Sequence, residues 1–375
     1  MTKKSKSKSI TFVDLKAQYL SIKNEIDAAV NDVINESAFI KGKYVQQFEI
    51  EYAEAHGSKH CISCANGTDA IYVTLKCLGI GSGDQVITVA NTWISTAEAI
   101  SQTGARPVFV DIHTDYYTID VTKIEEKITS KTKAIIPVHL FGQPANMDVI
   151  LDVCKQYNLL LIEDCAQAHF AEWKGKKVGK FGIAGTFSFY PGKNLGAYGD
   201  AGAIITDDDK FAINARKFSN HGAIKKHHHD FEGINSRLDG LQAAILSVKL
   251  IHIKDWNKKR FDIALHYNEL LDDIEGVTIP QIRHDAMHVF HLYVIRVEKR
   301  EKLRKFLIKK GISSGIHYPN PLPYLKAYEY LNYKPADFPI AYNYKDKILS
   351  LPIYPELDYQ KVKYITSAIR EFFNC

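Results

Sequence analysis

The sequence contains no apolar run long enough to cross a membrane, and its N-terminus has no apolar signal core. Net charge is also scarce: the 375 residues carry a formal +5, and Lys3, Lys4, Lys6 and Lys8 supply most of it. This small charge gives no reason to expect nucleic-acid binding. We therefore expect a cytoplasmic protein that binds neither membranes nor nucleic acids, with residues 1–11 as a disordered basic tail.

Metal-binding patterns are nearly absent as well. Cys61 and Cys64 form one C-x-x-C spacing, but no second C-x-x-C pair and no H-x₃-H pair accompanies it. Both lie in a strand-like segment, where small buried residues explain them. The six cysteines fit a reducing compartment, and we predict no metal site. No G-x-G-x-x-G follows the first strand-like run, which argues against a nicotinamide dehydrogenase.

What the sequence does contain is an alternation of short apolar runs and helical patterns. The apolar runs predict strands at 59–64, 85–90, 106–110, 133–138, 159–163, 185–189 and 201–206. Helical spacing predicts helices at 14–36, 67–78, 95–103, 121–129, 146–157 and 208–219. Strands as continuously apolar as 159–163 are buried on both faces, as in a mostly parallel sheet. We therefore expect an α/β fold, with residues 12–250 as a large domain.

A second, smaller domain is expected over residues 251–375. A long helical pattern from about 236 to 271 leads out of the large domain. It is followed by an apolar strand at 289–297 and by helices at 300–310 and 359–373. This mixture predicts a small α+β domain at the C-terminal end.

The most informative segment, residues 185–203, reads G-T-F-S-F-Y-P-G-K-N-L-G-A-Y-G-D-A-G-A and contains Lys193. Pro191 fixes φ and Gly192 permits a left-handed backbone, so the turn can direct the next side chain. Glycines at 196, 199 and 202 let backbone approach closely. A lysine that condenses with an aldehyde must be held, partly desolvated, against one carbon atom. Our first hypothesis is therefore a Schiff base between Lys193 and pyridoxal phosphate (PLP).

Other polar residues end predicted strands, where ligands bind in open α/β sheets. Gly67 and Thr68 open a helix after the strand at 59–64, where amides and a hydroxyl can hold a phosphate, although an ordinary helix cap also explains them. Asp164 follows an apolar strand, and it could pair with a protonated pyridine nitrogen or cap the next turn. Gln167, three residues on, could hydrogen-bond the cofactor's phenolic oxygen.

Two further residues complete the pattern. Trp93 ends the strand at 85–90 and could stack on a flat heteroaromatic ring, although most tryptophans are core or interface residues. Ser188, five residues before Lys193, has the small polar character of a phosphate donor. Together these residues supply a phosphate cup, a ring platform, a pyridinium partner and an amine, all at strand ends.

In these motifs the chain resembles the DegT/DnrJ/EryC1/StrS family of PLP-dependent nucleotide-sugar aminotransferases, from about residue 12 to residue 373. The most specific segments are A-N-G-T-D-A (65–70), E-D-C-A-Q-A-H (163–169), F-S-F-Y-P-G-K-N-L-G-A-Y-G-D-A-G (187–202) and G-I-N-S-R-L-D-G-L-Q-A (233–243). The resemblance implies the aspartate-aminotransferase fold (PLP fold type I), with a large, mostly parallel sheet domain and a smaller α+β domain.

The resemblance also implies roles for individual residues. It makes Lys193 the Schiff-base lysine and Asp164 the pyridine partner, and these are the two expected catalytic residues. Asn235 would reach the phosphate in the neighbouring subunit, which implies a homodimer with shared active sites. The other cofactor contacts it implies, in the order phosphate, ring face and phenolic oxygen, are Gly67, Thr68, Ser188, Trp93 and Gln167.

Contacts to the sugar nucleotide are also implied by place in similar enzymes. Arg237 could anchor a donor carboxylate or the diphosphate through its bidentate fork, or form a structural ion pair. In the loop 225–230, His227 stands where relatives often carry an aromatic such as tyrosine. A solvated loop therefore explains the run 227–229 as well as a sugar contact does. The expected substrate contacts are His221, His229, Arg237, His317 and Tyr318.

The reaction that the resemblance implies is a ping-pong transamination. L-Glutamate gives its amino group, 2-oxoglutarate leaves, and pyridoxamine phosphate delivers the amine to a nucleotide-linked keto sugar. The wording of 191–202 is similar to transaminases of dTDP-3-amino-3,6-dideoxyhexoses, so the expected acceptor is C3 of a dTDP-3-keto-6-deoxyhexose. Alternatives are C4 of a dTDP- or UDP-linked 4-keto sugar, a UDP-3-keto sugar, and a non-catalytic regulatory role. Related deoxysugar dehydratases have the same fold and use PLP, but they carry histidine at the lysine position. Lys193 therefore argues against a dehydratase.

Overall fold

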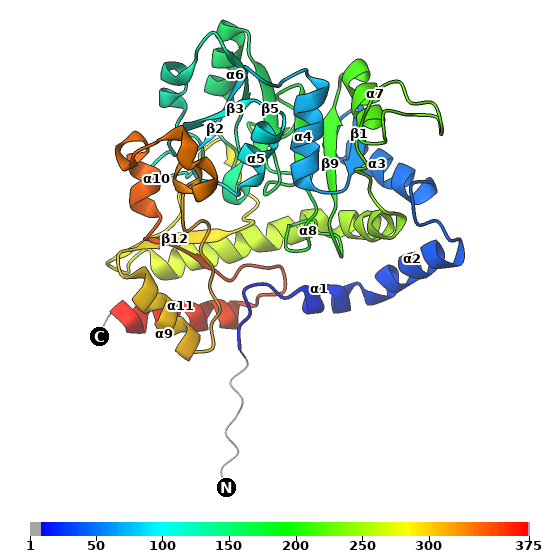
Figure 1. Ribbon diagram of the computed structural model, residues 1–375. Helices are drawn as coiled ribbons and strands as arrows, with labels where there is room; N and C mark the ends of the chain where they lie inside the picture. The colour runs from blue at the N-terminus through cyan, green and yellow to red at the C-terminus, as the bar shows by residue number, and fades with distance from the viewer. Residues whose placement is uncertain (1–8, 374–375) are drawn as a thin grey trace.

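The computed structural model describes residues 9–373 (Figure 1). Residues 1–8 of the predicted basic tail therefore lie outside the described residues, as do Asn374 and Cys375. The tail was predicted to reach residue 11, but Ile10 is buried and forms a parallel bridge with Ile312. This part of the prediction is wrong, because an apolar side chain at residue 10 has a place in the core.

A seven-stranded sheet organises the first two thirds of the chain. Its strand order is β1-β9-β8-β5-β4-β2-β3, and every neighbouring pair is parallel except the two pairs that β9 makes, with β8 and β1. All seven predicted strands are confirmed, with ends that differ by two residues at most. They are β1 (His60–Cys64), β2 (Gln85–Val89), β3 (Arg106–Val110), β4 (Thr132–Ile136), β5 (Leu160–Asp164), β8 (Ala184–Ser188) and β9 (Gly202–Thr206).

The central strands are buried on both faces, as their apolar runs indicate. In β2, Val86, Ile87 and Val89 are fully buried. Every residue of β9 is buried as well. Four predicted helices pack around the sheet and are confirmed. They are α4 (Gly67–Cys77), α5 (Ser95–Gln102), α6 (Met147–Tyr157) and α7 (Asp209–Phe218).

Three helical predictions need correction. The helix expected at 14–36 is two helices, α1 (Leu15–Ser21) and α2 (Lys23–Asn35), because Ile22 leaves the helical region with φ −127°. The segment 121–129 forms two short 3₁₀ turns, Val121–Lys123 and Glu125–Lys127, instead of an α-helix. The sequence analysis missed α3 (Lys43–His56), which left-handed glycines delimit at both ends.

The C-terminal part is built on α8 (Gly240–Leu271), which crosses the centre of Figure 1 beneath the sheet. An antiparallel sheet follows, in the order β10 (Val277–Thr278), β12 (Tyr293–Val297) and β13 (Ile348–Leu351). The predicted boundary between the two domains, at residue 250, falls inside α8, and this helix is continuous there. The division into two domains therefore stays a prediction. The helices of this part are α9 (Arg300–Lys309), α10 (Pro339–Tyr344) and α11 (Tyr359–Phe373).

Smaller elements link these parts. In a third sheet, β6 (Glu172–Trp173) pairs with β11 (Ala286–Met287) on one side and with β7 (Lys176–Lys177) on the other, so residues far apart in sequence meet there. Within residues 9–373, no helix is both long and apolar enough to span a membrane. The remaining 3₁₀ turns are Leu140–Gly142, Leu322–Tyr324, Lys326–Leu331 and Pro335–Asp337.

Glu163, at the end of β5, fixes the loop that follows β7. Its Oε1 accepts the backbone N–H groups of Phe181 (2.6 Å) and Gly182 (3.0 Å). Its Oε2 accepts the N–H of Gly179 (2.7 Å) and a bond from Nε2 of His139 (3.1 Å). The carboxylate is fully buried, so these donors replace the water that would otherwise solvate its charge.

We predict that Glu163→Gln destabilises the protein by about 3–5 kcal/mol, because an amide nitrogen would face backbone N–H groups and leave buried donors unpaired. Chemical denaturation followed by circular dichroism measures the change. Glu54→Gln, on the exposed face of α3, is the matched control and should stay within about 0.5 kcal/mol of the parent. Equal stability of the two variants would contradict this account of Glu163.

Candidate active site

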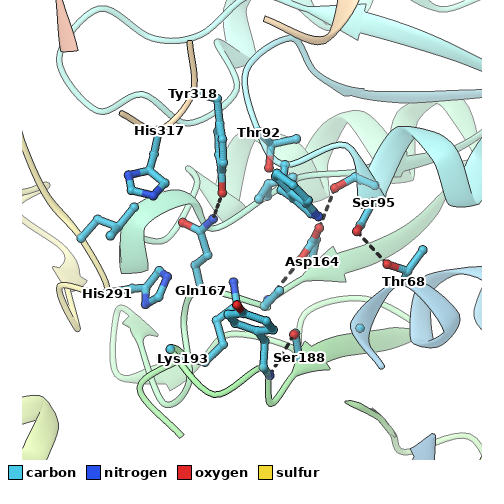
Figure 2. A pocket seen from close by; sticks show the side chains of 18 of the residues that line it. Thr68, Thr92, Ser95, Asp164, Gln167, Ser188, Lys193, His291, His317 and Tyr318 are labelled. Carbon is cyan, nitrogen blue, oxygen red and sulfur yellow. Dashed lines mark hydrogen bonds between the residues drawn. The ribbon is translucent and has the colours of Figure 1, made fainter. Parts of the chain in front are cut away.

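A cavity of about 520 Å³ opens at the carboxyl ends of β1, β2, β5 and β8. This is where an open α/β sheet is expected to bind its ligand, because the loops that leave parallel strands converge there. Figure 2 shows the side chains of Lys193, Asp164 and Gln167 directed toward this common space. Nine of the predicted site residues line the cavity: Gly67, Thr68, Trp93, Asp164, Gln167, Ser188, Lys193, His317 and Tyr318.

Lys193 follows the expected tight turn, and its N–H donates to the carbonyl of Tyr190 (2.8 Å). Gly192 does not use the left-handed region that the sequence analysis expected of it. Gly196 is needed beside this turn, because a Cβ atom there would lie 2.4 Å from the carbonyl oxygen of Pro191. Burial lowers the pKa of Lys193 to about 8, and the charge of Asp164 opposes this shift. The amine is thus far more available as a neutral base than an ordinary lysine.

Asp164 ends β5 with its carboxylate almost fully buried. Oδ2 accepts the hydroxyl of Thr96 (2.7 Å), and Oδ1 accepts the N–H of Ala166 (3.1 Å). Among residues 9–373, no lysine, arginine or histidine lies within 4 Å of this carboxylate. A buried negative charge without a cation is costly. The site is therefore suited to a ligand that brings a positive charge.

Hydroxyl groups and helix N-termini form a cradle beside the Asp164 carboxylate in the same cavity. Asn66 caps α4 by accepting the N–H of Asp69 (2.8 Å). The hydroxyls of Thr68 and Ser95, in the first turns of α4 and α5, lie 2.7 Å apart. Ser188 packs so closely that a Cβ on Gly67 would lie 2.6 Å from its Cβ. Hydroxyls beside helix N-termini favour a phosphate.

Gln167 has a fixed orientation between the backbone and Tyr318. Its Oε1 accepts the N–H of Phe141 (2.7 Å), so its Nε2 faces the Tyr318 hydroxyl and donates to it (3.0 Å). Burial raises the pKa of Tyr318 strongly, so the phenol stays protonated. The ring centroids of Tyr318 and Trp93 lie 5.8 Å apart, and Trp93 remains 58% exposed at the cavity. The Trp93 ring is thus free to contact a ligand.

Histidines form the wall contributed by the C-terminal part of the chain. His317 stacks on Phe12, with ring centroids 5.6 Å apart, and its Nδ1 lies 2.8 Å from the hydroxyl of Ser350. Burial lowers the pKa of His317 to about 4, and nearby Lys193 adds to this shift. Burial likewise lowers the pKa of His291 well below its usual value. Both rings are neutral at physiological pH and can offer hydrogen bonds to a ligand.

Four predicted residues do not line the cavity of this chain. Asn235 is exposed and bridges to Asn220, and Arg237 lies two residues on. His221 and His229 meet in an exposed loop, where Nδ1 of His229 lies 2.7 Å from the His221 carbonyl oxygen. For Asn235 the sequence analysis expected a contact in a neighbouring subunit, which a single chain does not test. The roles of all four stay predictions.

Several polar residues of the cavity were not predicted from the sequence. Ser95 and Thr96 follow the segment that was singled out for Trp93, but at the start of a helix such residues resemble ordinary caps. His291 is placed by packing of distant segments, which no local pattern signals. The cavity-lining polar residues that were missed are Asn66, Thr92, Ser95, Thr96, Tyr190, Asp200, Arg260 and His291.

A possible metal cluster elsewhere has a simpler explanation. Ligand atoms of His139, Glu163 and Cys165 lie within 4.8 Å of one another, all buried. The Glu163 oxygens are already occupied by backbone donors, and Nδ1 of His139 accepts the N–H of Ala145 (3.1 Å). Hydrogen bonding therefore accounts for this cluster as a part of the fold.

The cavity residues fit PLP by their chemistry. An unpaired buried carboxylate at Asp164 suits a protonated ring nitrogen, and the hydroxyl cradle suits a phosphate. Lys193 supplies an amine of lowered pKa in the same cavity. Few other ligands combine an anionic group, a basic flat ring and a carbon that reacts with an amine.

Comparison with known proteins agrees with this reading. Residues 20–370 match the family described as the DegT/DnrJ/EryC1/StrS aminotransferase family. A dTDP-3-amino-3,6-dideoxy-alpha-D-galactopyranose transaminase from Aneurinibacillus thermoaerophilus is 44% identical over 97% of this chain and 99% of its own. A UDP-N-acetyl-3-dehydro-alpha-D-glucosamine 3-aminotransferase from Acidithiobacillus ferrooxidans is 39% identical over 96% and 97%.

Two further similarities complete the comparison. A protein from Geobacillus stearothermophilus named a pleiotropic regulatory protein is 44% identical over 97% of this chain and 99% of its own. The crystal structure of DesV from S. venezuelae, in complex with a ketimine intermediate, superposes with a TM-score of 0.96 at 38% identity and covers 98% of this chain and 99% of that one. The chain therefore belongs to the DegT/DnrJ/EryC1/StrS aminotransferase family.

Proposed function

We propose that this protein binds PLP and transfers the amino group of L-glutamate to a nucleotide-linked keto sugar. The observation that carries the proposal is the presence, in one cavity, of a lysine with a pKa of about 8 and a buried carboxylate that has no cation within 4 Å. A purely structural cavity has no need of two such costly groups. Membership of the aminotransferase family supports the same conclusion.

The residues that would hold PLP are distributed around the cavity. Asp164 would pair with the ring nitrogen, Trp93 would cover the ring face, and Gln167 would donate to the phenolic oxygen through its second Nε2 hydrogen. The phosphate would lie at Gly67, Thr68 and Ser188. Asn235 would add a phosphate contact in the neighbouring subunit of a homodimer. Each active site would then contain residues of both subunits.

Lys193 would act as the acid–base group of the reaction. PLP supplies an electron sink for the carbanion that forms when the donor α-carbon loses its proton. The neutral Nζ of Lys193 accepts this proton and later returns it, which a pKa near 8 permits at physiological pH. Asp164 keeps the ring nitrogen protonated, because its buried carboxylate is stabilised most by a partner of positive charge.

For the acceptor we propose C3 of a dTDP-3-keto-6-deoxyhexose. The sequence motif at 191–202 and the Aneurinibacillus relative support this choice. The Acidithiobacillus relative supports a UDP-linked 3-keto sugar as the alternative, and C4 of a 4-keto sugar is a further one. His317 and Tyr318 line the cavity and would contact the sugar, and Arg237, His221 and His229, which lie outside it, are the further proposed contacts.

A regulatory protein that keeps the fold without the chemistry is the competing function. It is favoured by the name of the Geobacillus relative. The lysine and carboxylate described above favour catalysis, since a regulator needs neither. The first experiment therefore separates these two functions and identifies the acceptor together.

We predict that the PLP-loaded protein, given glutamate and a panel of nucleotide-linked 3-keto and 4-keto sugars, releases 2-oxoglutarate and aminates one of them. Mass spectrometry and NMR of the product identify the nucleotide and the aminated carbon. Lys193→Ala should lower turnover by at least about 10³-fold, because the acid–base group is lost. Lys254→Ala, at an exposed position of α8, is the control. Full activity of Lys193→Ala would refute the assignment.

We also predict that Lys193→Met stabilises the cofactor-free protein at pH 7. Since the pKa of Lys193 is lower in the folded protein than the ordinary 10.5, the unfolded chain binds more protons between about pH 8 and 10.5. Stability of the parent therefore rises with pH across this window, and the advantage of the variant shrinks. Thermal melts from pH 7 to 10 measure it, with Lys254→Met as the control. A gap that does not change with pH would contradict the lowered pKa.

A further inference from the structure

The side chain of Thr96 forms a hydrogen bond to the buried carboxylate of Asp164. It lies in the first turn of α5, 1% exposed, and its hydroxyl donates to Oδ2 of Asp164 over 2.7 Å. The two residues are 68 positions apart in the sequence and come together because β2 and β5 end at the same edge of the sheet. Thr96 also lines the cavity.

No other side chain in residues 9–373 hydrogen-bonds this carboxylate. The second contact, to Oδ1, comes from the backbone N–H of Ala166 at 3.1 Å. The backbone of Asp164 is itself fixed, because its N–H donates to Pro137 and its carbonyl accepts from His139. The carboxylate group of Asp164 can still rotate about its Cβ–Cγ bond. The hydrogen bond from Thr96 to Oδ2 restrains this rotation.

We propose that Thr96 is a positioning residue: its hydroxyl keeps the carboxylate of Asp164 turned toward the ring nitrogen of the bound pyridine cofactor. This inference rests on the proposed function. A hydrogen bond to the charged form of a carboxylate stabilises that form, and a bond of this kind is stronger in a buried site. With Thr96 on Oδ2 and Ala166 on Oδ1, the remaining lone pairs of Asp164 are available to the ligand.

The helix that carries Thr96 gives the arrangement its precision. Thr96 is β-branched, so few χ1 rotamers are open to it in a helix. The preceding residue, Ser95, contacts the Thr68 hydroxyl at 2.7 Å in the cradle. One turn of α5 thus sets both the partner of the ring nitrogen and a hydroxyl of the phosphate cradle, and so fixes their relative position.

The test compares the binding of two cofactors to the complete, cofactor-free protein. One is PLP, and the other is 1-deazapyridoxal phosphate, in which a carbon replaces the ring nitrogen. Titrations followed by absorbance give the dissociation constants for the parent, Thr96→Val and Thr96→Ser. Thr74→Val is the matched control, since Thr74 is equally buried on α4 but donates to the carbonyl of Ala70.

We expect Thr96→Val to weaken PLP binding by about 10- to 100-fold, the effect of losing a hydrogen bond to a charged group. Binding of the deaza compound should change less than about twofold, because it has no ring nitrogen for Asp164 to meet. Thr96→Ser should recover most of the affinity for PLP, and Thr74→Val should leave both constants unchanged.

The opposite outcomes are equally clear. An equal loss for both compounds means that Thr96 only supports the fold, and unchanged PLP binding means that Asp164 does not need it; either result overturns the inference. If Thr96→Val does not fold by circular dichroism, Thr96→Ala takes its place. A parent protein that binds no PLP at all would refute the proposed function itself, which keeps the two failures apart.

Discussion

The buried carboxylate of Asp164 is the constraint on which the site depends. A charge removed from water must be solvated by something else, and here a hydroxyl and a backbone N–H supply part of that solvation. The neighbouring Glu163 meets the same requirement with three backbone N–H groups and Nε2 of His139, so it belongs to the fold. Two adjacent acidic residues thus have opposite uses, decided by whether their hydrogen-bonding capacity is filled by the protein.

The sheet makes this arrangement possible by bringing strand ends together. β1, β5 and β8 run in one direction, with β9 reversed between β1 and β8, so their carboxyl ends lie at one edge. Residues from separate loops then meet in a single cavity without any one loop having to be long. Residues in the C-terminal part, above all His317 and Tyr318, close the cavity from the other side.

Much of this could be predicted from the sequence, and the failures have physical reasons. Continuous apolar runs gave the strands, because burial on both faces leaves a strong local pattern. The helix α3 was missed because its apolar residues alternate with many charged ones after Gly42. Lys193 and Asp164 stand in distinctive motifs, whereas Thr96 acquires its meaning only from a contact across 68 residues. Asn235 and Arg237 lie outside the cavity of one chain, so the geometry of a single chain leaves their predicted roles untested.

The N-terminal segment has a consequence for the order in which the site is completed. Phe12 lines the cavity by stacking on His317, and Ile10 pairs with Ile312. On the ribosome, these first residues emerge long before their partners, which at about 5–20 residues per second follow roughly 15–60 s later. The cavity therefore closes only when nearly the whole chain has been synthesised. A nascent or truncated chain that lacks His317, Tyr318 and Ile353 has no finished pocket in which to capture a ligand.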